Sequence, residues 1–208
     1  MDIPANAKYG IIRETSQRTD NLLSIKQLRK WWSSLLLTIP AQASAFMPPK
    51  SPNAGRGLLD ATNYGYVCPL LEVRKPAGEL KIPHRYWIMN EDCQNLNIWT
   101  PSCGNAKFPV MVWLHGGGFE AGSAIEHPAY EGENMCRNGQ VVVVSINYRL
   151  NVLGYLDLSS FGEEYKDSGN AGTEDIVAAL QWIKRISRGL AEIRKMLPCS
   201  GNQGAVGK

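Results

Sequence analysis

The sequence predicts a single domain of the α/β class. Two short runs, Phe108–Leu114 (FPVMVWL) and Val141–Asn147 (VVVVSIN), are rich in apolar and β-branched residues, as are strands buried on both faces. They are followed by Thr173–Ile186 (TEDIVAALQWIKRI), whose apolar residues recur with the helical period. Buried strands followed by a helix are typical of α/β proteins. A length of 208 residues suits one such domain.

Residues 1–45 show no clear period, and they contain a stretch that resembles a targeting signal. Lys26–Lys30 is basic, Trp31–Ile39 is apolar, and Ala41–Ala45 (AQASA) has an A-x-A cleavage pattern. However, 25 residues precede this stretch, which is long for a signal, and an apolar core segment or a mistranslated stretch explains it equally well. A cleaved signal would place the protein outside the cytoplasm. The apolar run is shorter than the roughly 20 residues that a membrane-spanning helix needs, so we expect no membrane span.

The middle of the chain contains irregular segments and one further strand. Met47–Pro52 and Gly55–Gly57 carry the proline and glycine residues of irregular surface chain. Asn95–Thr100 (NLNIWT) alternates polar and apolar residues, as a half-buried strand does. The segment Pro101–Lys107 is rich in turn residues and separates this strand from the next one.

The predicted helix has a recognisable start. Thr173 is the expected N-cap, and Glu174 and Asp175 are placed to interact with the positive end of the helix dipole. The residues expected on its buried face are Ile176, Ala179, Leu180 and Ile183.

Charge and cysteine content argue against two classes of function. The net charge is only +3, and Lys and Arg are scattered among Asp and Glu, so the concentrated basic face of a nucleic-acid-binding protein is absent. The five cysteines form no CxxC pair and no cluster with His, so we expect no metal site and no cofactor. Because their number is odd, at least one cysteine is free or bonded to another chain.

A glycine-rich loop, His115–Phe119 (HGGGF), follows the first apolar run. Consecutive glycines adopt backbone angles closed to other residues, so such a loop can direct several N–H groups at one point. That arrangement can hold the oxyanion of an acyl-transfer intermediate. A tight or flexible turn is the alternative, and a phosphate-binding loop lacks support because neither nucleotide-binding glycine spacing is present. The preceding strand and His115 favour the oxyanion element, which indicates a reaction class but no substrate.

Several motifs occur in the order and spacing found in the type-B carboxylesterase and cholinesterase family. Glu91–Cys93 precedes NLNIWTP, the loop stands in PVMVWLHGGGF, and VVVVSINYRLNVLGYL and GNAGTEDIVAALQWIKR follow. Residues 46–186 therefore resemble the N-terminal portion of that family's domain, with residues 187–208 as a tail outside the resemblance. The resemblance implies an incomplete α/β-hydrolase fold, with the early strands of a mixed sheet and the first crossover helix.

The resemblance also implies a role for each residue of the loop. Gly117 and Gly118 would donate their N–H groups to the oxyanion. His115, Gly116 and Phe119 would support the loop.

Two specific contacts are implied in the same way. Cys68 would form a disulfide with Cys93 near the mouth of the active site, which would favour an oxidising compartment; two buried free thiols are the alternative. Arg149 would form a structural ion pair with Asp175. Trp87 lies between the two cysteines, but its spacing to Cys93 differs from that of the choline-binding tryptophan of cholinesterases, so we infer no choline specificity.

The chain departs from the family where the nucleophile belongs. Ester hydrolysis by this route needs a Ser in a G-x-S-x-G turn, followed in the chain by an acid and a His. No G-x-S-x-G occurs, and the only histidines are His84, His115 and His127. We expect His84 and His127 to be solvated loop residues. No catalytic triad can be assembled from these residues.

The tail after Arg185 has no recognisable strand pattern, and it can be read in another frame. If one base is added after the Arg185 codon, codons compatible with the tail can encode RNISRFGRNPENVTLFGQSGGGGK, which contains the family's G-Q-S-G-G motif. In each shifted codon, two bases are fixed by the present protein sequence. The serine codon, for example, consists of the last base of the Asn202 codon and the first two bases of the Gln203 codon, so it could encode only Ser or Pro. We therefore hypothesise a frameshifted, prematurely ended gene product. Its missing strands would leave an apolar sheet edge that favours aggregation.

The expected function is hydrolysis of a small carboxylic ester through a serine acyl-enzyme. The chain as written lacks the Ser, acid and His, so we expect it to be nearly inactive. A non-catalytic binding or adhesion protein of the cholinesterase-like group is one alternative. An exported fragment with an independent role is another.

Overall fold

The computed structural model describes residues 11–12, 45–50, 58–59, 64–70, 85–101, 108–190 and 196–200. The targeting-like stretch before Ala45 lies outside these residues, as does His84. Among the helices that are described, none is long and apolar enough to cross a membrane.

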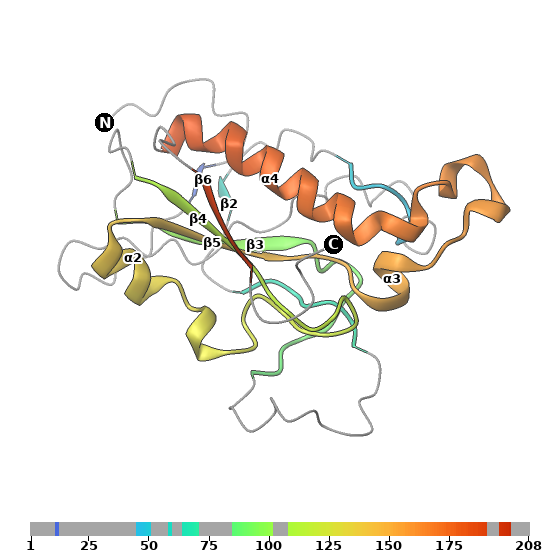
Figure 1. The fold of residues 1–208 in the computed structure, drawn as a ribbon, viewed down its shortest axis with the longest axis horizontal. Coiled ribbons are helices and arrows are strands. Elements are labelled where there is room, and N and C mark those ends of the chain that lie inside the picture. Colours follow the sequence, from blue (N-terminus) through green and yellow to red (C-terminus); the bar gives the residue numbers. More distant parts are fainter. Residues whose placement is uncertain are drawn as a thin grey trace.

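A four-stranded mixed sheet forms the centre of the described structure, in the order β3-β5-β4-β6 (Figure 1). Strand β3 (Asn95–Trp99) pairs antiparallel with β5 (Val142–Asn147). Strand β4 (Val110–Leu114) lies parallel to β5 on one side and to β6 (Met196–Ser200) on the other. The predicted mixed sheet of an α/β fold is therefore confirmed. A separate pair, β1 (Ile11–Ile12) and β2 (Leu58–Leu59), runs parallel.

One face of the sheet packs against the long helix α4 (Ala171–Leu190), which runs along it in Figure 1. Four residues predicted for the buried helix face all belong to this contact: Ala179 and Ile183 are buried, and Ile176 and Leu180 pack against the same core. Apolar strand residues on this side include Leu96, Val112, Val144 and Ile146. Burying such side chains contributes about 1.5–3 kcal/mol each, so this interface contributes strongly to stability.

The helix begins earlier and ends later than its sequence pattern indicates. A 3₁₀ turn, Ser168–Asn170, leads directly into α4 at Ala171, so the prediction of Thr173 as N-cap is wrong. Glu174 does lie in the first turn. The Asp175 side chain instead pairs with Arg149, which lies after β5. The continuation to Leu190 lies beyond the predicted end at Ile186 because no proline or cap interrupts the chain there.

The opposite sheet face packs against α2 (Glu133–Gly139), and Figure 1 shows α2 and α4 on opposite sides of the sheet. Trp99 and Val143 share a core there with Cys136 of α2. Gly132 permits this approach, because a Cβ on it would lie 2.6 Å from Val143 Cγ1.

Two sequence-based expectations about strands are corrected by this arrangement. Strand β3 is buried at every position, not on one face only, because its polar residues lie in an interior network. Within it, Asn97 Nδ2 donates to Ser145 Oγ at 3.2 Å and Asn147 Nδ2 donates to Asn95 Oδ1 at 3.1 Å. The tail, where we expected no strand, contributes β6, which pairs with the otherwise open edge of β4.

Candidate active site

The three parallel strands end at one edge of the sheet, and the glycine loop starts there. Leu114, the last residue of β4, is in register with Ile146 of β5 and with Ser200 of β6. The carboxyl edge of such a sheet is the usual location of ligand sites in α/β proteins. His115–Phe119 therefore leaves β4 at the position where an active site is expected.

The loop has a conformation that depends on its glycines. Gly117 has a φ of 113° and Gly118 a φ of 63°, and Phe119 follows with a φ of 66°. A Cβ on Gly117 would lie 2.0 Å from the carbonyl oxygen of Ala121, which excludes any side chain there. Phe119 is held in its unusual conformation because Asn151 N donates to its carbonyl at 2.7 Å.

The two peptide units that carry the proposed donors are held through their carbonyl groups. Gly117 O accepts hydrogen bonds from Glu120 N at 3.1 Å and Ala121 N at 3.2 Å. Because a trans peptide is planar, with its C=O and N–H pointing in opposite directions, these bonds also set the direction of the Gly118 N–H. Gly117 and Gly118 are exposed, and within the described part of the chain no hydrogen bond uses their N–H groups.

His115 lies beneath the loop and is only 1% exposed. Its ring stacks on Tyr148, with centroids 4.7 Å apart and planes inclined by 17°. The Tyr148 hydroxyl donates to the His115 carbonyl at 3.2 Å. Burial lowers the pKa of His115 to about 4, although the hydrogen bond with Gly116 opposes this shift. The imidazole is therefore neutral at pH 7.

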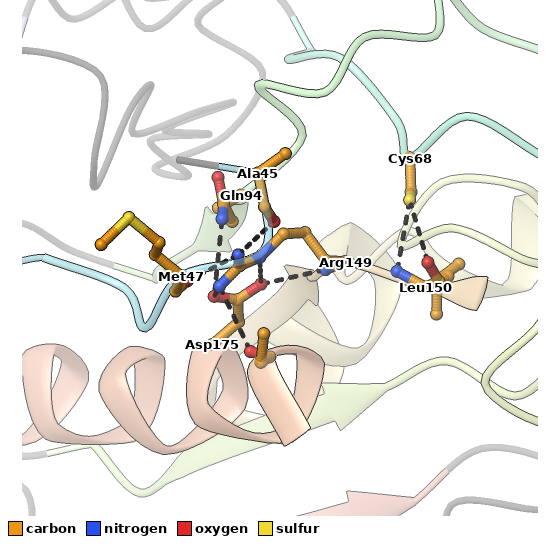
Figure 2. A network of polar contacts seen from close by, with 8 residues as sticks. Ala45, Met47, Cys68, Gln94, Arg149, Leu150 and Asp175 are labelled. Atoms are coloured by element: carbon orange, nitrogen blue, oxygen red, sulfur yellow. Dashed lines mark hydrogen bonds and ion pairs between the residues drawn. The ribbon is translucent and has the colours of Figure 1, made fainter. Parts of the chain in front are cut away.

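Arg149 and Asp175 of α4 meet in a buried ion pair (Figure 2). Arg149 Nη2 lies 2.7 Å from Asp175 Oδ1, Nε donates to Oδ2 at 2.8 Å, and both side chains are 2% exposed. The remaining guanidinium donors reach the carbonyl groups of Ala45, Met47 and Ala171. Burial raises the pKa of the Asp175 carboxyl, and hydrogen bonding and charge from Arg149 oppose that rise. The pair thus links the segment after β5, the start of α4 and the chain at residues 45–47.

Cys68 and Cys93 lie together, but they are free thiols, so the structure does not contain the disulfide expected between them. Both are buried, at 2% and 0% exposure. Interaction with the Cys68 thiol, together with burial, raises the pKa of the Cys93 thiol well above its ordinary value. Cys68 Sγ also accepts a hydrogen bond from Leu150 N at 3.2 Å (Figure 2). The hydrogen-bonding capacity of the Cys68 sulfur is therefore used without a covalent bond.

Residues 38–187 match the model of the Carboxylesterase family, which is well over half of the chain. The chain belongs to the carboxylesterase family. The para-nitrobenzyl esterase of Bacillus subtilis is 34% identical over 177 residues, which are 85% of this chain and 33% of that enzyme. The acetylcholinesterase of Electrophorus electricus is 35% identical, over 70% of this chain and 23% of that protein.

Solved esterase structures have a similar fold over the part that this chain matches. A Clostridium hathewayi esterase that can hydrolyze aliphatic aromatic polyesters superposes with a TM-score of 0.79 and 42% identity. That match covers 93% of this chain and 36% of the esterase. The present chain therefore spans about a quarter to a third of the length of these relatives.

Other candidate residues of this carboxylesterase chain lie away from the glycine loop or differ from expectation. His127 precedes the 3₁₀ turn Pro128–Tyr130, and it is half-buried, so it is only partly solvated. Its ring contacts Tyr130 with centroids 5.0 Å apart. Trp87 is 40% exposed and packs edge-to-face on Tyr64. Among the described residues, no group of three His, Cys, Asp or Glu side chains is arranged to hold a metal ion.

Sequence reasoning missed two residues that support the carboxylesterase loop. Tyr148 holds His115, and Asn151 holds Phe119 and also donates from Nδ2 to Pro69 O at 2.8 Å. Asn151 adopts a left-handed φ of 47°, which Asn tolerates better than most residues. The tolerance of Asn for this conformation was the only sign in the sequence that Asn151 has a structural role. It does not identify Phe119 and Pro69 as the partners of Asn151.

Proposed function

We propose that this chain carries the oxyanion-binding part of a serine carboxylesterase active site. The observation that supports this most strongly is the pair of adjacent N–H groups at Gly117 and Gly118. Both are exposed, both lie at the carboxyl edge of the sheet, and both peptide units are held through their carbonyls. Such pre-oriented donors stabilise a tetrahedral oxyanion because they need no reorganisation when its charge develops.

In the proposed reaction, a serine hydroxyl attacks the carbonyl carbon of a small ester while a His accepts its proton. The oxyanion that forms receives hydrogen bonds from Gly117 and Gly118, the alcohol leaves, and water then hydrolyses the acyl-enzyme. The 208 residues contain no G-x-S-x-G, and no triad can be built from their histidines. We therefore propose that this chain by itself has no esterase turnover beyond a residual level.

We further propose that the nucleophile is encoded one base out of frame after Arg185. In the restored reading, the segment V-T-L-F coincides with Leu197–Ser200 and is followed directly by G-Q-S-G-G. Strand β6 pairs at these positions with β4, and Ser200 is opposite Leu114. A serine just after this strand would start from the same sheet edge as the glycine loop, which is where the nucleophile of an α/β-hydrolase is required.

Two measurements test these proposals. Sequencing the gene past Arg185 should show the codons of the restored reading, and any other codons there would refute the frameshift. A clone with the base restored should hydrolyse p-nitrophenyl acetate with saturable kinetics, whereas the 208-residue chain should not. If the restored protein is folded but inactive, the proposed esterase function is wrong.

A matched pair of glycine substitutions tests the role of the loop in the restored protein. Gly117→Ala places a Cβ 2.0 Å from the Ala121 carbonyl oxygen, so the loop must move and displace a donor. Loss of one oxyanion donor lowers turnover by about 10²–10³-fold. Gly139→Ala is the control, because its Cβ would make only ordinary contacts, the nearest at 3.6 Å. Equal turnover in both variants would contradict the role of the loop.

A further inference from the structure

The peptide unit between Gly116 and Gly117 is held differently from the unit that follows it. Gly117 O accepts two backbone N–H groups, so the direction of the Gly118 N–H is set by the backbone alone. Gly116 O instead lies 2.8 Å from His115 Nδ1. Within the described residues, no other hydrogen bond reaches Gly116 O. The orientation of this peptide unit, and with it the Gly117 N–H, therefore depends on one side chain.

The contact defines which ring nitrogen of His115 carries the proton. A carbonyl oxygen is only an acceptor, so the nitrogen that faces it must be a donor, and a neutral imidazole has one N–H. The proton must therefore be on Nδ1. The other nitrogen, Nε2, is buried without a hydrogen-bond partner, so no acceptor stabilises a proton there. Burial also lowers the pKa of His115 to about 4, which keeps the ring neutral.

The surrounding residues leave room for this contact and hold the ring in place. Gly122 has a φ of 108°, and a Cβ on it would lie 2.6 Å from Gly116 O and 2.8 Å from His115 Nδ1. Any larger residue would therefore collide with both partners of the hydrogen bond. On the other side, Tyr148 stacks on the imidazole and bonds the His115 carbonyl.

We infer that His115, as the Nδ1–H tautomer, is the positioning residue that aims the Gly117 N–H at the oxyanion. His115 does not itself touch the reacting atoms. It holds the Gly116 carbonyl so that the N–H on the opposite side of the same peptide faces outward. This inference rests on the proposed donor role of Gly117, but the orientation itself can be measured without any catalysis.

The first test is the position of the proton in the ¹⁵N-labelled 208-residue chain. Long-range ¹H–¹⁵N spectra distinguish a protonated from an unprotonated ring nitrogen, and His84 and His127 serve as internal references. At pH 7 we expect His115 to carry its proton on Nδ1. A proton on Nε2, or on both nitrogens, would overturn the inference.

The second test compares His115→Asn with His115→Leu. The Asn amide nitrogen is attached two bonds from Cβ, as Nδ1 is, so it can donate to Gly116 O, whereas Leu fills similar space without a donor. Residual dipolar couplings report the directions of the Gly117 and Gly118 N–H bonds. We expect the Gly117 direction to change in the Leu variant and to be restored in the Asn variant, with Gly118 unchanged in both.

The inference fails if Gly117 keeps its direction in the Leu variant, if Asn does not restore it, or if Gly118 moves equally. If the Leu variant does not fold, the tautomer measurement on the unsubstituted chain still decides. The esterase assay of the restored protein is independent of these spectra. An inactive restored protein with the Nδ1–H tautomer would refute the proposed function, but His115 would still set the direction of the Gly117 N–H.

Discussion

Replacing Arg149 with Met should destabilise the fold severely while leaving a side chain of similar length. Both Arg149 and Asp175 are 2% exposed, and the guanidinium makes two direct bonds to the carboxylate, at 2.7 and 2.8 Å. In the Met variant, the buried Asp175 carboxyl loses its positive partner. The charge and hydrogen bonds of that partner oppose the rise in pKa that burial causes. Breaking a buried ion pair on one side costs about 3–5 kcal/mol. Domains are stable by only about 5–15 kcal/mol, so this is a large fraction of the total.

The assay is urea unfolding at pH 7, followed by tryptophan fluorescence. With a slope of about 1–3 kcal/mol per molar urea, the expected loss lowers the midpoint by at least about 1 M. Arg137→Met is the matched control, because Arg137 pairs with Glu133 on the surface at 36% and 44% exposure. A surface pair of this kind contributes about 0–1 kcal/mol, so the control midpoint should change little.

A double variant makes the test specific to the pair. Asp175→Asn alone leaves the Arg149 charge buried with a neutral partner, whereas Arg149→Met with Asp175→Asn removes both charges. We expect the double variant to lose less stability than the sum of the two single variants. The reasoning is refuted if the Arg149→Met midpoint equals that of Arg137→Met, or if the two single losses add without any coupling.

Three further outcomes follow from the structure. Gly122→Ala should lower the free energy of unfolding, measured by thermal unfolding, by about 1–3 kcal/mol. The reasons are its φ of 108° and the collision of a Cβ with Gly116 O and His115 Nδ1. The control, Gly139→Ala, should change this free energy by no more than about 0.5 kcal/mol. The pKa of His115 is about 4 in the folded chain against an ordinary 6.5, so the unfolded chain takes up the proton first on acidification. The contribution of His115 to the free energy of unfolding is therefore fully present above about pH 6.5, and it falls by roughly 3 kcal/mol as the pH is lowered to 4. A His115→Asn variant whose stability has the same pH dependence would contradict this. In the reduced chain, Cys68 and Cys93 are buried at 2% and 0% exposure, so a thiol reagent should modify them only after urea is added, and fast modification of the native chain would refute their burial.

Much of the fold could be predicted because it depends on short-range patterns. The apolar runs before His115 and before Tyr148 became β4 and β5, since continuous β-branched segments suit a sheet covered on both faces. The helical period of α4 placed the correct residues against the sheet. The glycine loop could be identified because three glycines after a strand leave few alternatives. Ordered motifs along two-thirds of the chain were sufficient to identify the family.

Other features were decided only by tertiary packing. The alternating pattern of β3 indicated one exposed face, yet Asn95 and Asn97 are buried, because a partner strand supplies polar groups to them. The tail offered no strand pattern, yet β6 formed, because the edge of β4 presents unpaired backbone groups to which a further strand can add.

The site shows the same division between local pattern and packing. The sequence by itself determined that a glycine loop follows a strand and that His115 begins it. Only the folded chain decided that the imidazole turns beneath the loop onto the Gly116 carbonyl, with Tyr148 stacked behind it and Gly122 leaving the space. The direction of a side chain depends on which surfaces, from segments far apart in the sequence, bury it. It also depends on which polar groups there can form hydrogen bonds with it. Those surfaces come together only when segments far apart in the chain have packed.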